Sequence, residues 1–171
     1  AQVIKIEQPV GGDMTRGLMS ANSDGMAPSF LAANLGKRSL TLDLKNPKAT
    51  EIVHKLVAKA DVIVENFKPG TIERLGFGYK SMRAIKPELV YASISGFGQT
   101  GPRASLPAFD GAIQAYSGMM SISGHAETGP VRSGYFAVDM STALNAAFAI
   151  TSALLRRANT GEGQHVDVSM L

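Results

Sequence analysis

The 171 residues include 44% hydrophobic and 18% charged residues, which is enough apolar material for one domain with a hydrophobic core. The absence of cysteine excludes disulfide scaffolds, thiolate zinc sites and cysteine nucleophiles, and it indicates a cytoplasmic protein. The net charge of +3 comes from basic residues interleaved with acidic ones, which argues against a nucleic-acid partner and fits a small polyanionic ligand.

The first third of the chain predicts two strands and a helix. The chain begins AQVIKIEQP with no signal-like apolar region, which suggests a fragment that starts at the edge of a strand. Asn46 and Pro47 are typical of an N-cap and a first helical residue. The expected elements are a strand at 3–6, a loop at 18–36 with a short helix near 29–35, a strand at 39–44 and a helix from 47.

Strands and helices then alternate, which predicts a parallel sheet with helices on its faces. DVIVEN is typical of a strand that is buried on both faces, and LVYASIS is a second apolar run rich in β-formers. The remaining expected elements are strands at 61–66, 89–95 and 165–170, helices at 71–75, 79–85, 108–119 and 140–157, and loops at 96–107 and 123–134.

The uncharged run at 140–155 is shorter than the roughly 20 apolar residues that span a bilayer, and it contains serine, threonine and asparagine. It therefore predicts a buried helix, and we expect no membrane partner. His54, His125 and His165 lack metal-ligand spacing, so no metal site is expected.

Gly96, Gly98 and Gly101 match G-x-G-x-x-G directly after a strand. A dinucleotide site also needs a helix that starts within the motif and an acidic residue about 20 positions later. Both signals are missing, so an ordinary glycine-rich turn is expected.

The turn ENFKPG lies between an expected strand and an expected helix, where open α/β sheets bind ligands. Asn66, Phe67, Lys68 and the later Arg74 offer an amide, a flat ring and two positive charges, which would suit an adenine nucleotide with its phosphates. The alternative is a plain connection with surface charges.

Asp139 is the only charged residue in the stretch YFAVDMSTALNAAFAI. Since it precedes an expected helix, its carboxylate would serve as an N-cap next to the positive end of the helix dipole, which favours the ionised form. The alternative is a partly desolvated nucleophile beside glycine-rich loops. The two roles are compatible.

Six strings, taken in order, resemble the class III acyl-CoA transferases, a family with formyl-CoA transferase, carnitine CoA-transferases and α-methylacyl-CoA racemases. They are VIKIEQP with GGDMTRG, NLGKRSLTLDLK, ADVIVENFKPGTIERLGFGY, YASISGFGQTGP, FDGAIQAYSGMMSISG and TGEGQHVDVSML. The resemblance covers essentially all 171 residues. It implies an α/β fold with a Rossmann-like open parallel sheet that has helices on both faces, in which residues 1–171 are part of the large domain and lack both family flanks.

The resemblance also implies a reaction. Such enzymes move CoA from an acyl-CoA to a carboxylic acid through a mixed anhydride on an aspartate, here Asp139, and they form interlocked homodimers. Coenzyme A is a substrate, and no tightly bound cofactor is implied. The implied CoA contacts are Gln8, Leu42, Asp43, Leu44, Lys45, Asn66, Phe67, Lys68 and Arg74.

Three positions bear on the choice of activity. Gln8 and Pro107 stand where formyl-CoA transferases carry Arg and Lys, so formate and oxalate are not assumed as substrates. Phe109 stands where the racemases carry the histidine that pairs with the aspartate, which weakens the racemase alternative. Phe109 and Asp110 are then expected to line the acyl pocket. A non-catalytic CoA-binding fragment is the other alternative.

Overall fold

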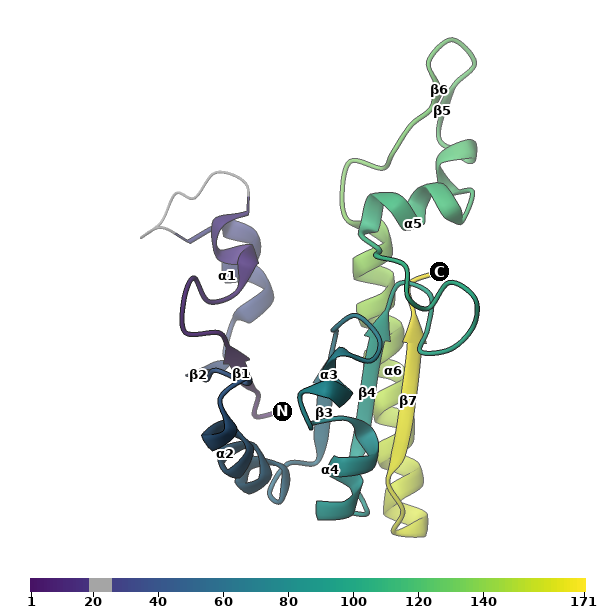
Figure 1. Ribbon diagram of the computed structural model, residues 1–171. Helices are drawn as coiled ribbons and strands as arrows, with labels where there is room; N and C mark the ends of the chain where they lie inside the picture. Colours follow the sequence, from purple (N-terminus) through teal and green to yellow (C-terminus); the bar gives the residue numbers. More distant parts are fainter. Residues whose placement is uncertain (19–25) are drawn as a thin grey trace. The chain divides into compact units, whose positions relative to one another are not determined.

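The structure is a computed structural model that describes residues 1–18 and 26–171 (Figure 1). Two compact units are distinguished, Ala1–Val53 and His54–Leu171, and each is described by itself. The first unit contains β1 (Ile4–Glu7), the 3₁₀ turn η1 (Met14–Gly17), α1 (Pro28–Asn34), β2 (Arg38–Thr41) and the start of α2 (Pro47–Val57).

The second unit contains most of the regular structure. Its elements are β3 (Val62–Glu65), α3 (Thr71–Arg74), α4 (Tyr79–Ile85), β4 (Val90–Ser95), α5 (Asp110–Tyr116), η2 (Met119–Ile122), β5 (Gly124–His125), β6 (Gly129–Pro130), α6 (Ala137–Thr160) and β7 (Gln164–Ser169).

In the first unit, β1 and β2 form a parallel pair in which Glu7 lies opposite Thr41. Glu7 is 6% exposed, and its carboxylate accepts hydrogen bonds from Arg16 through Nε and Nη2, both at 2.9 Å. The Ser39 hydroxyl on β2 donates to the same carboxylate at 2.8 Å. The buried charge is therefore paired and hydrogen-bonded, as a charge in a low-dielectric site needs to be.

These contacts give the first unit a pH-dependent stability. Hydrogen bonds from Arg16 and then Ser39 lower the pKa of Glu7 from 4.5 to about 2. Because the folded-state pKa lies below the unfolded one, the stabilisation is complete above pH 4.5 and is lost as the pH falls to about 2. The shift corresponds to about 3 kcal/mol.

We therefore expect Glu7→Gln to lower the free energy of unfolding at pH 7 by about this amount and to flatten its dependence on pH below 4.5. Denaturant unfolding at pH 7 and pH 3 measures both effects. Glu162→Gln is the matched control, because its ion pair with Arg156 is solvent-exposed and contributes about 0–1 kcal/mol. Equal pH dependence in the Glu7 variant and the wild type would refute the assignment.

The second unit is built on a three-stranded parallel sheet in the order β3-β4-β7. One face of the sheet packs against α6, where Val90, Ala92 and Val166 form a buried cluster with Ala153 of the helix. Figure 1 shows α6 running alongside β4 and β7. β4 is buried on both faces, which explains its continuous apolar sequence.

The opposite face of the sheet carries aromatic and polar side chains. Tyr79 of α4 stacks on His165 of β7 with ring centroids 4.7 Å apart, and Tyr91 meets both rings edge-on. The Tyr91 hydroxyl donates to the Phe77 carbonyl at 3.0 Å, and His165 Nε2 lies 2.9 Å from the Ser93 hydroxyl. α4 is thus fixed to this face, so helices lie against both faces of the sheet, as predicted.

α6 is the longest element, with 24 residues. Among the helices that the structure describes, α6 is the one that is long and apolar enough to cross a membrane, judged by length and composition only. The prediction of a buried helix is correct for the face that packs on the sheet. The other face exposes a row of apolar side chains, with Leu144 at 72% and Phe148 at 75%. Met140 and Leu155 belong to the same row.

Several predicted boundaries differ from the observed ones. The strand expected at 39–44 ends at Thr41, because the Asp43 carboxylate accepts the Lys45 N–H at 3.0 Å and forms a turn. The helix expected at 140–157 begins earlier, at Ala137, and the loop expected at 123–134 contains the short β5-β6 hairpin. Part of the loop expected at 18–36 lies outside the described residues.

Candidate functional site

Asp139 lies in the first turn of α6 as its third helical residue. The N-cap position is occupied by Phe136, which makes no side-chain capping hydrogen bond. The prediction that Asp139 caps this helix is therefore wrong. Its side chain is exposed at the surface of the described chain.

Asp110 caps α6 from a different helix. It is the first residue of α5 and is 4% exposed. Its Oδ2 accepts hydrogen bonds from the backbone N–H groups of Val138 at 2.9 Å and Asp139 at 3.1 Å. A carboxylate in this position satisfies two unpaired donors and faces the positive end of the helix dipole. The capping role thus belongs to Asp110.

Gln114 holds Asp110 in place from one turn along α5. It is fully buried, and its Nε2 donates to Oδ1 of Asp110. Its Oε1 accepts the backbone N–H of Ser133 at 2.9 Å, in the loop that precedes α6. Gln114 was not predicted as a site residue from the sequence, although its four-residue spacing from Asp110 places both side chains on one face of a helix.

The environment of Asp139 favours the protonated form. Partial desolvation by the surrounding protein, and then the negative charge of Asp110, raise the pKa of the Asp139 carboxyl above its ordinary value. The helix dipole acts in the opposite direction. An ionised Asp139 at neutral pH stays a prediction.

The ENFKPG turn follows β3 at the carboxyl edge of the sheet. The Asn66 amide donates to the Ile94 carbonyl of β4 at 2.7 Å, and the buried Glu65 carboxylate accepts the Phe67 N–H at 2.8 Å. Phe67 is 40% exposed, and Lys68 is exposed. The Arg74 guanidinium donates to the Thr71 hydroxyl at 2.9 Å and so folds back over the turn. The four residues predicted here thus lie in one connection, which runs from the end of β3 to the end of α3.

The other predicted CoA contacts lie in the first unit. Gln8 directly follows β1 and Leu42 follows β2, and the Leu42 N–H donates to the Glu7 carbonyl at 2.9 Å. The turn at 42–45 continues from there. These residues meet at the carboxyl edge of the β1-β2 pair, which is the edge where α/β sheets bind ligands.

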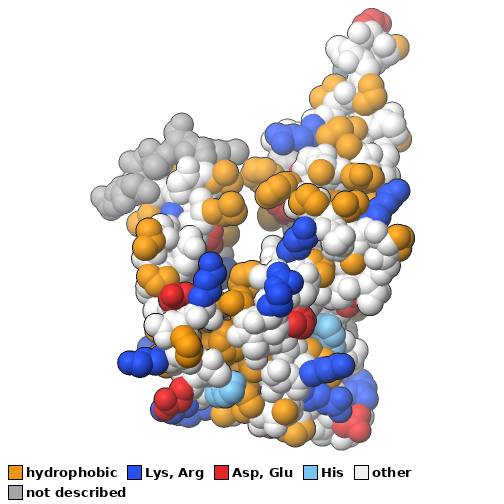
Figure 2. Space-filling model, viewed as in Figure 1, with side chains coloured by type: hydrophobic (Ala, Val, Ile, Leu, Met, Phe, Trp, Pro, Cys, Tyr) orange, Lys and Arg blue, Asp and Glu red, His pale blue; other side chains and the backbone are white. Residues whose placement is uncertain are grey.

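Phe109 precedes α5 and is 72% exposed, whereas the neighbouring Asp110 is buried and hydrogen-bonded within the chain. Figure 2 shows hydrophobic side chains at the surface around α5, and Tyr116 and Ile122 are exposed in this part of the chain as well. The glycine-rich loop 96–101 is not followed by a helix until Asp110, so the turn predicted for it is confirmed.

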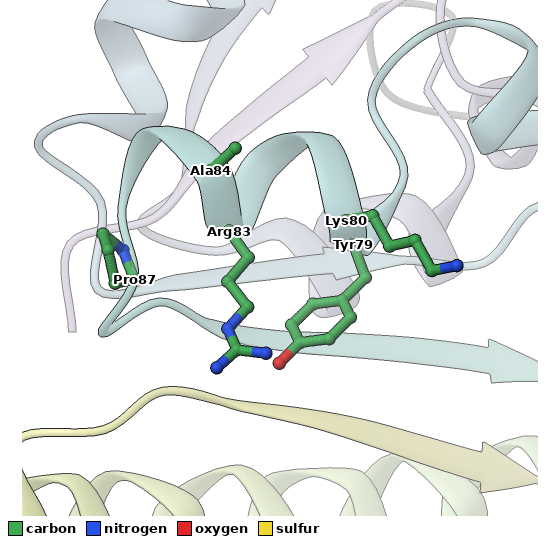
Figure 3. A pocket seen from close by; sticks show the side chains of 5 residues that line it. All are labelled: Tyr79, Lys80, Arg83, Ala84 and Pro87. Carbon is green, nitrogen blue, oxygen red and sulfur yellow. The ribbon is translucent and has the colours of Figure 1, made fainter.

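A shallow pocket of about 430 Å³ lies along α4 and the turn that follows it (Figure 3). In Figure 3 the side chains of Arg83 and Tyr79 extend next to each other, and the guanidinium carbon lies 6.0 Å from the ring centroid. None of the predicted site residues lines this pocket, so the candidate site remains at Asp139. The pocket next to α4 is also lined by Lys80, Ala84 and Pro87.

Comparison with known proteins identifies the family. The sequence model of CoA-transferase family III matches residues 1–171. The succinate–glutarate CoA-transferase of Agrobacterium fabrum is 41% identical over 177 aligned residues, which cover 100% of this chain and 44% of the relative. The acetyl-CoA:oxalate CoA-transferase of Acetobacter aceti is 44% identical over 99% of this chain and 44% of the relative.

The fold agrees with this assignment. The crystal structure of a CAIB/BAIF family protein from Brucella suis superposes with a TM-score of 0.94 at 43% identity, and the match covers 99% of this chain and 46% of that chain. This chain therefore spans less than half the length of the relatives it matches. Matches over its whole length, in sequence and in fold, show that the chain belongs to CoA-transferase family III.

Proposed function

We propose that the protein transfers coenzyme A from an acyl-CoA to a carboxylic acid, with Asp139 as the nucleophile. The observation that carries the proposal is that Asp110, and not Asp139, caps the start of α6. Asp110 satisfies the backbone N–H groups of Val138 and Asp139, so the Asp139 carboxylate is not used as a cap and stays exposed.

In the proposed reaction an Asp139 carboxylate oxygen attacks the thioester carbonyl carbon. The carbon–sulfur bond breaks, CoA leaves as the thiolate, and a mixed anhydride joins the acyl group to Asp139. The acceptor carboxylate then attacks the Asp139 carbonyl carbon of this anhydride, which releases the donor acid and leaves an anhydride between Asp139 and the acceptor. The CoA thiolate finally attacks the acyl carbon of the acceptor, which forms the new thioester and frees the Asp139 carboxylate. Acyl-CoA and free carboxylate are thereby converted to free carboxylate and acyl-CoA, with no net change in charge or oxidation state.

The electrostatics of the site support this role. Because desolvation and Asp110 raise the pKa of Asp139, its ionised form is more basic than an ordinary aspartate and hence a better nucleophile.

We further propose that the CoA moiety binds at the carboxyl edges of the parallel strands. In the second unit, the exposed Phe67 ring would contact the adenine, while Lys68 and Arg74 would pair with phosphate groups. The residues proposed to contact CoA are Gln8, Leu42, Asp43, Leu44, Lys45, Asn66, Phe67, Lys68 and Arg74.

The names of the matched relatives guide the choice of acceptor. They pair CoA with succinate and glutarate or with oxalate, which are all dicarboxylic acids. We therefore propose a small carboxylic acid as the acceptor. From the family resemblance alone, we also propose a cytoplasmic homodimer as the working form.

Trapping with hydroxylamine tests the proposal. The protein as its gene encodes it is incubated with a panel of acyl-CoAs, quenched with hydroxylamine and mapped by mass spectrometry. We expect a hydroxamate on Asp139, because hydroxylamine attacks an anhydride far faster than a free carboxylate. Asp139→Asn should give none, and Asp61→Asn, which removes an exposed carboxylate elsewhere, should give the wild-type yield.

Two outcomes contradict the proposal. A protein that binds acyl-CoA without any adduct would be a binding protein. Exchange of the α-hydrogen of a 2-methylacyl-CoA with deuterated water, without transfer of CoA, would identify a racemase instead.

A further inference from the structure

The start of α6 is fixed by a buried polar network that reaches the backbone of Asp139 itself. One oxygen of Asp110 accepts the N–H groups of Val138 and Asp139 at 2.9 and 3.1 Å. The other oxygen accepts a hydrogen bond from Gln114, so both oxygens are in use. Asp110 and Gln114 are 4% and 0% exposed, which leaves water little access to replace them.

The network also fixes the loop that leads into α6. Gln114 Oε1 accepts the Ser133 N–H at 2.9 Å, and the Ser133 hydroxyl donates to the Tyr135 carbonyl at 3.0 Å. Two side chains of α5 therefore hold both the loop before the helix and its first turn. The peptide N–H that Asp110 binds belongs to the residue whose carboxylate would react, so any shift of this N–H displaces the carboxylate as well.

We propose that Asp110, oriented by Gln114, is a positioning residue that fixes the Asp139 carboxylate for attack and leaves it free of capping hydrogen bonds. This inference rests on the transfer chemistry proposed above. Asp110 does not touch the substrate in this role and acts through the backbone of Asp139. It thereby replaces the acyl-pocket role expected for Asp110 from the sequence.

The chemistry of Asp110 explains why a carboxylate is needed. Its two oxygens face only donors, namely two backbone N–H groups and the Gln114 amide. An asparagine would turn its own NH₂ group toward one of these donors, so at least one bond would be lost. The removal of one charge would also withdraw the negative field that acts on Asp139.

The test compares Asp110→Asn with Asp61→Asn in the protein as its gene encodes it. Asp61 pairs with Arg157 near the other end of α6, so this control also removes a carboxylate that contacts the helix. For Asp110→Asn we expect kcat to fall on the order of 10²-fold, as for a misplaced reacting group, while KM changes by less than about threefold. Asp61→Asn should stay within about twofold of the wild type in both constants.

The pH profile separates positioning from a structural role. Loss of the Asp110 charge lowers the pKa of Asp139, so the acidic limb of kcat/KM should move to lower pH. Among the described residues, Asp110 is the charged group that raises the pKa of Asp139. The Arg132 side chain lies next to Gly111 of α5 and is the same in both variants. A fall in activity with an unmoved limb would mean a structural role only and would overturn the proposal.

Amide hydrogen exchange provides a readout that does not depend on activity. In Asp110→Asn the amides of Val138 and Asp139 should exchange at least about tenfold faster, since a charge-assisted hydrogen bond is lost, and Asp61→Asn should leave them unchanged. Unchanged exchange in Asp110→Asn would overturn the network itself. A wild-type protein that forms no adduct on Asp139 would instead refute the transfer chemistry, so the two failures are distinguishable.

Discussion

Asp139→Asn is expected to lower kcat for CoA transfer by at least about 10³-fold, because a neutral amide cannot form the anhydride. The same variant should fold normally. Asp110, not Asp139, accepts the N–H groups of the first turn of α6, so the helix cap is retained. We expect the free energy of unfolding to change by less than about 0.5 kcal/mol, as for most surface substitutions. Steady-state kinetics and denaturant unfolding of the same preparation measure both effects.

Asp139→Glu tests whether the position of the carboxylate matters as well as its presence. It keeps the carboxylate but places the oxygens one methylene further from the backbone, so we expect a smaller loss, on the order of 10²-fold. If Asp139→Asn retained kcat within about tenfold of the wild type, another group would have to be the nucleophile, and the proposed function would fall.

A large loss of stability is expected for Gly163→Ala. Gly163 precedes β7, and its N–H donates to the Pro87 carbonyl at 3.3 Å. A Cβ atom there would lie 2.2 Å from the Leu89 carbonyl oxygen and 2.6 Å from both the Glu88 carbonyl carbon and the Leu89 nitrogen. All three are backbone atoms, so no rotamer change relieves the clash, and β7 has to move away from β4. We expect a loss of about 2–4 kcal/mol in unfolding free energy.

Gly161→Ala is the matched control, two residues earlier in the same connection. Gly161 ends α6 in the left-handed region at φ 74°, and a Cβ atom there would meet nothing within 4 Å. Only the backbone conformation is unfavourable, which costs about 1 kcal/mol. Thermal or denaturant unfolding of the two variants decides the matter. If Gly161→Ala were the more destabilising, the close approach of the Gly163 backbone to the β4 connection would be wrong.

Local signals in the sequence were sufficient to predict where several helices begin and end. α4 was predicted with its observed bounds, Tyr79–Ile85, because a glycine precedes it and Pro87 follows shortly after. α2 was predicted from Asn46, and the Asn46 side chain does accept the Lys48 N–H at 3.0 Å. Helix caps and helix-ending prolines act within a few residues of the chain, so they can be read from the sequence.

The family and the α/β class were likewise determined by the sequence alone, because the motifs occur in order along the whole chain. The catalytic role of Asp139 stays a prediction. The sequence did not determine which carboxylate caps α6. Asp110 and Asp139 both lie near a predicted helix start, and their contact joins residues 29 positions apart. Only the packing of α5 against α6 brings the Asp110 carboxylate to those N–H groups, and no local pattern encodes that contact. For the same physical reason Gln114, a buried amide with partners in two other segments, was recognised only in the tertiary structure.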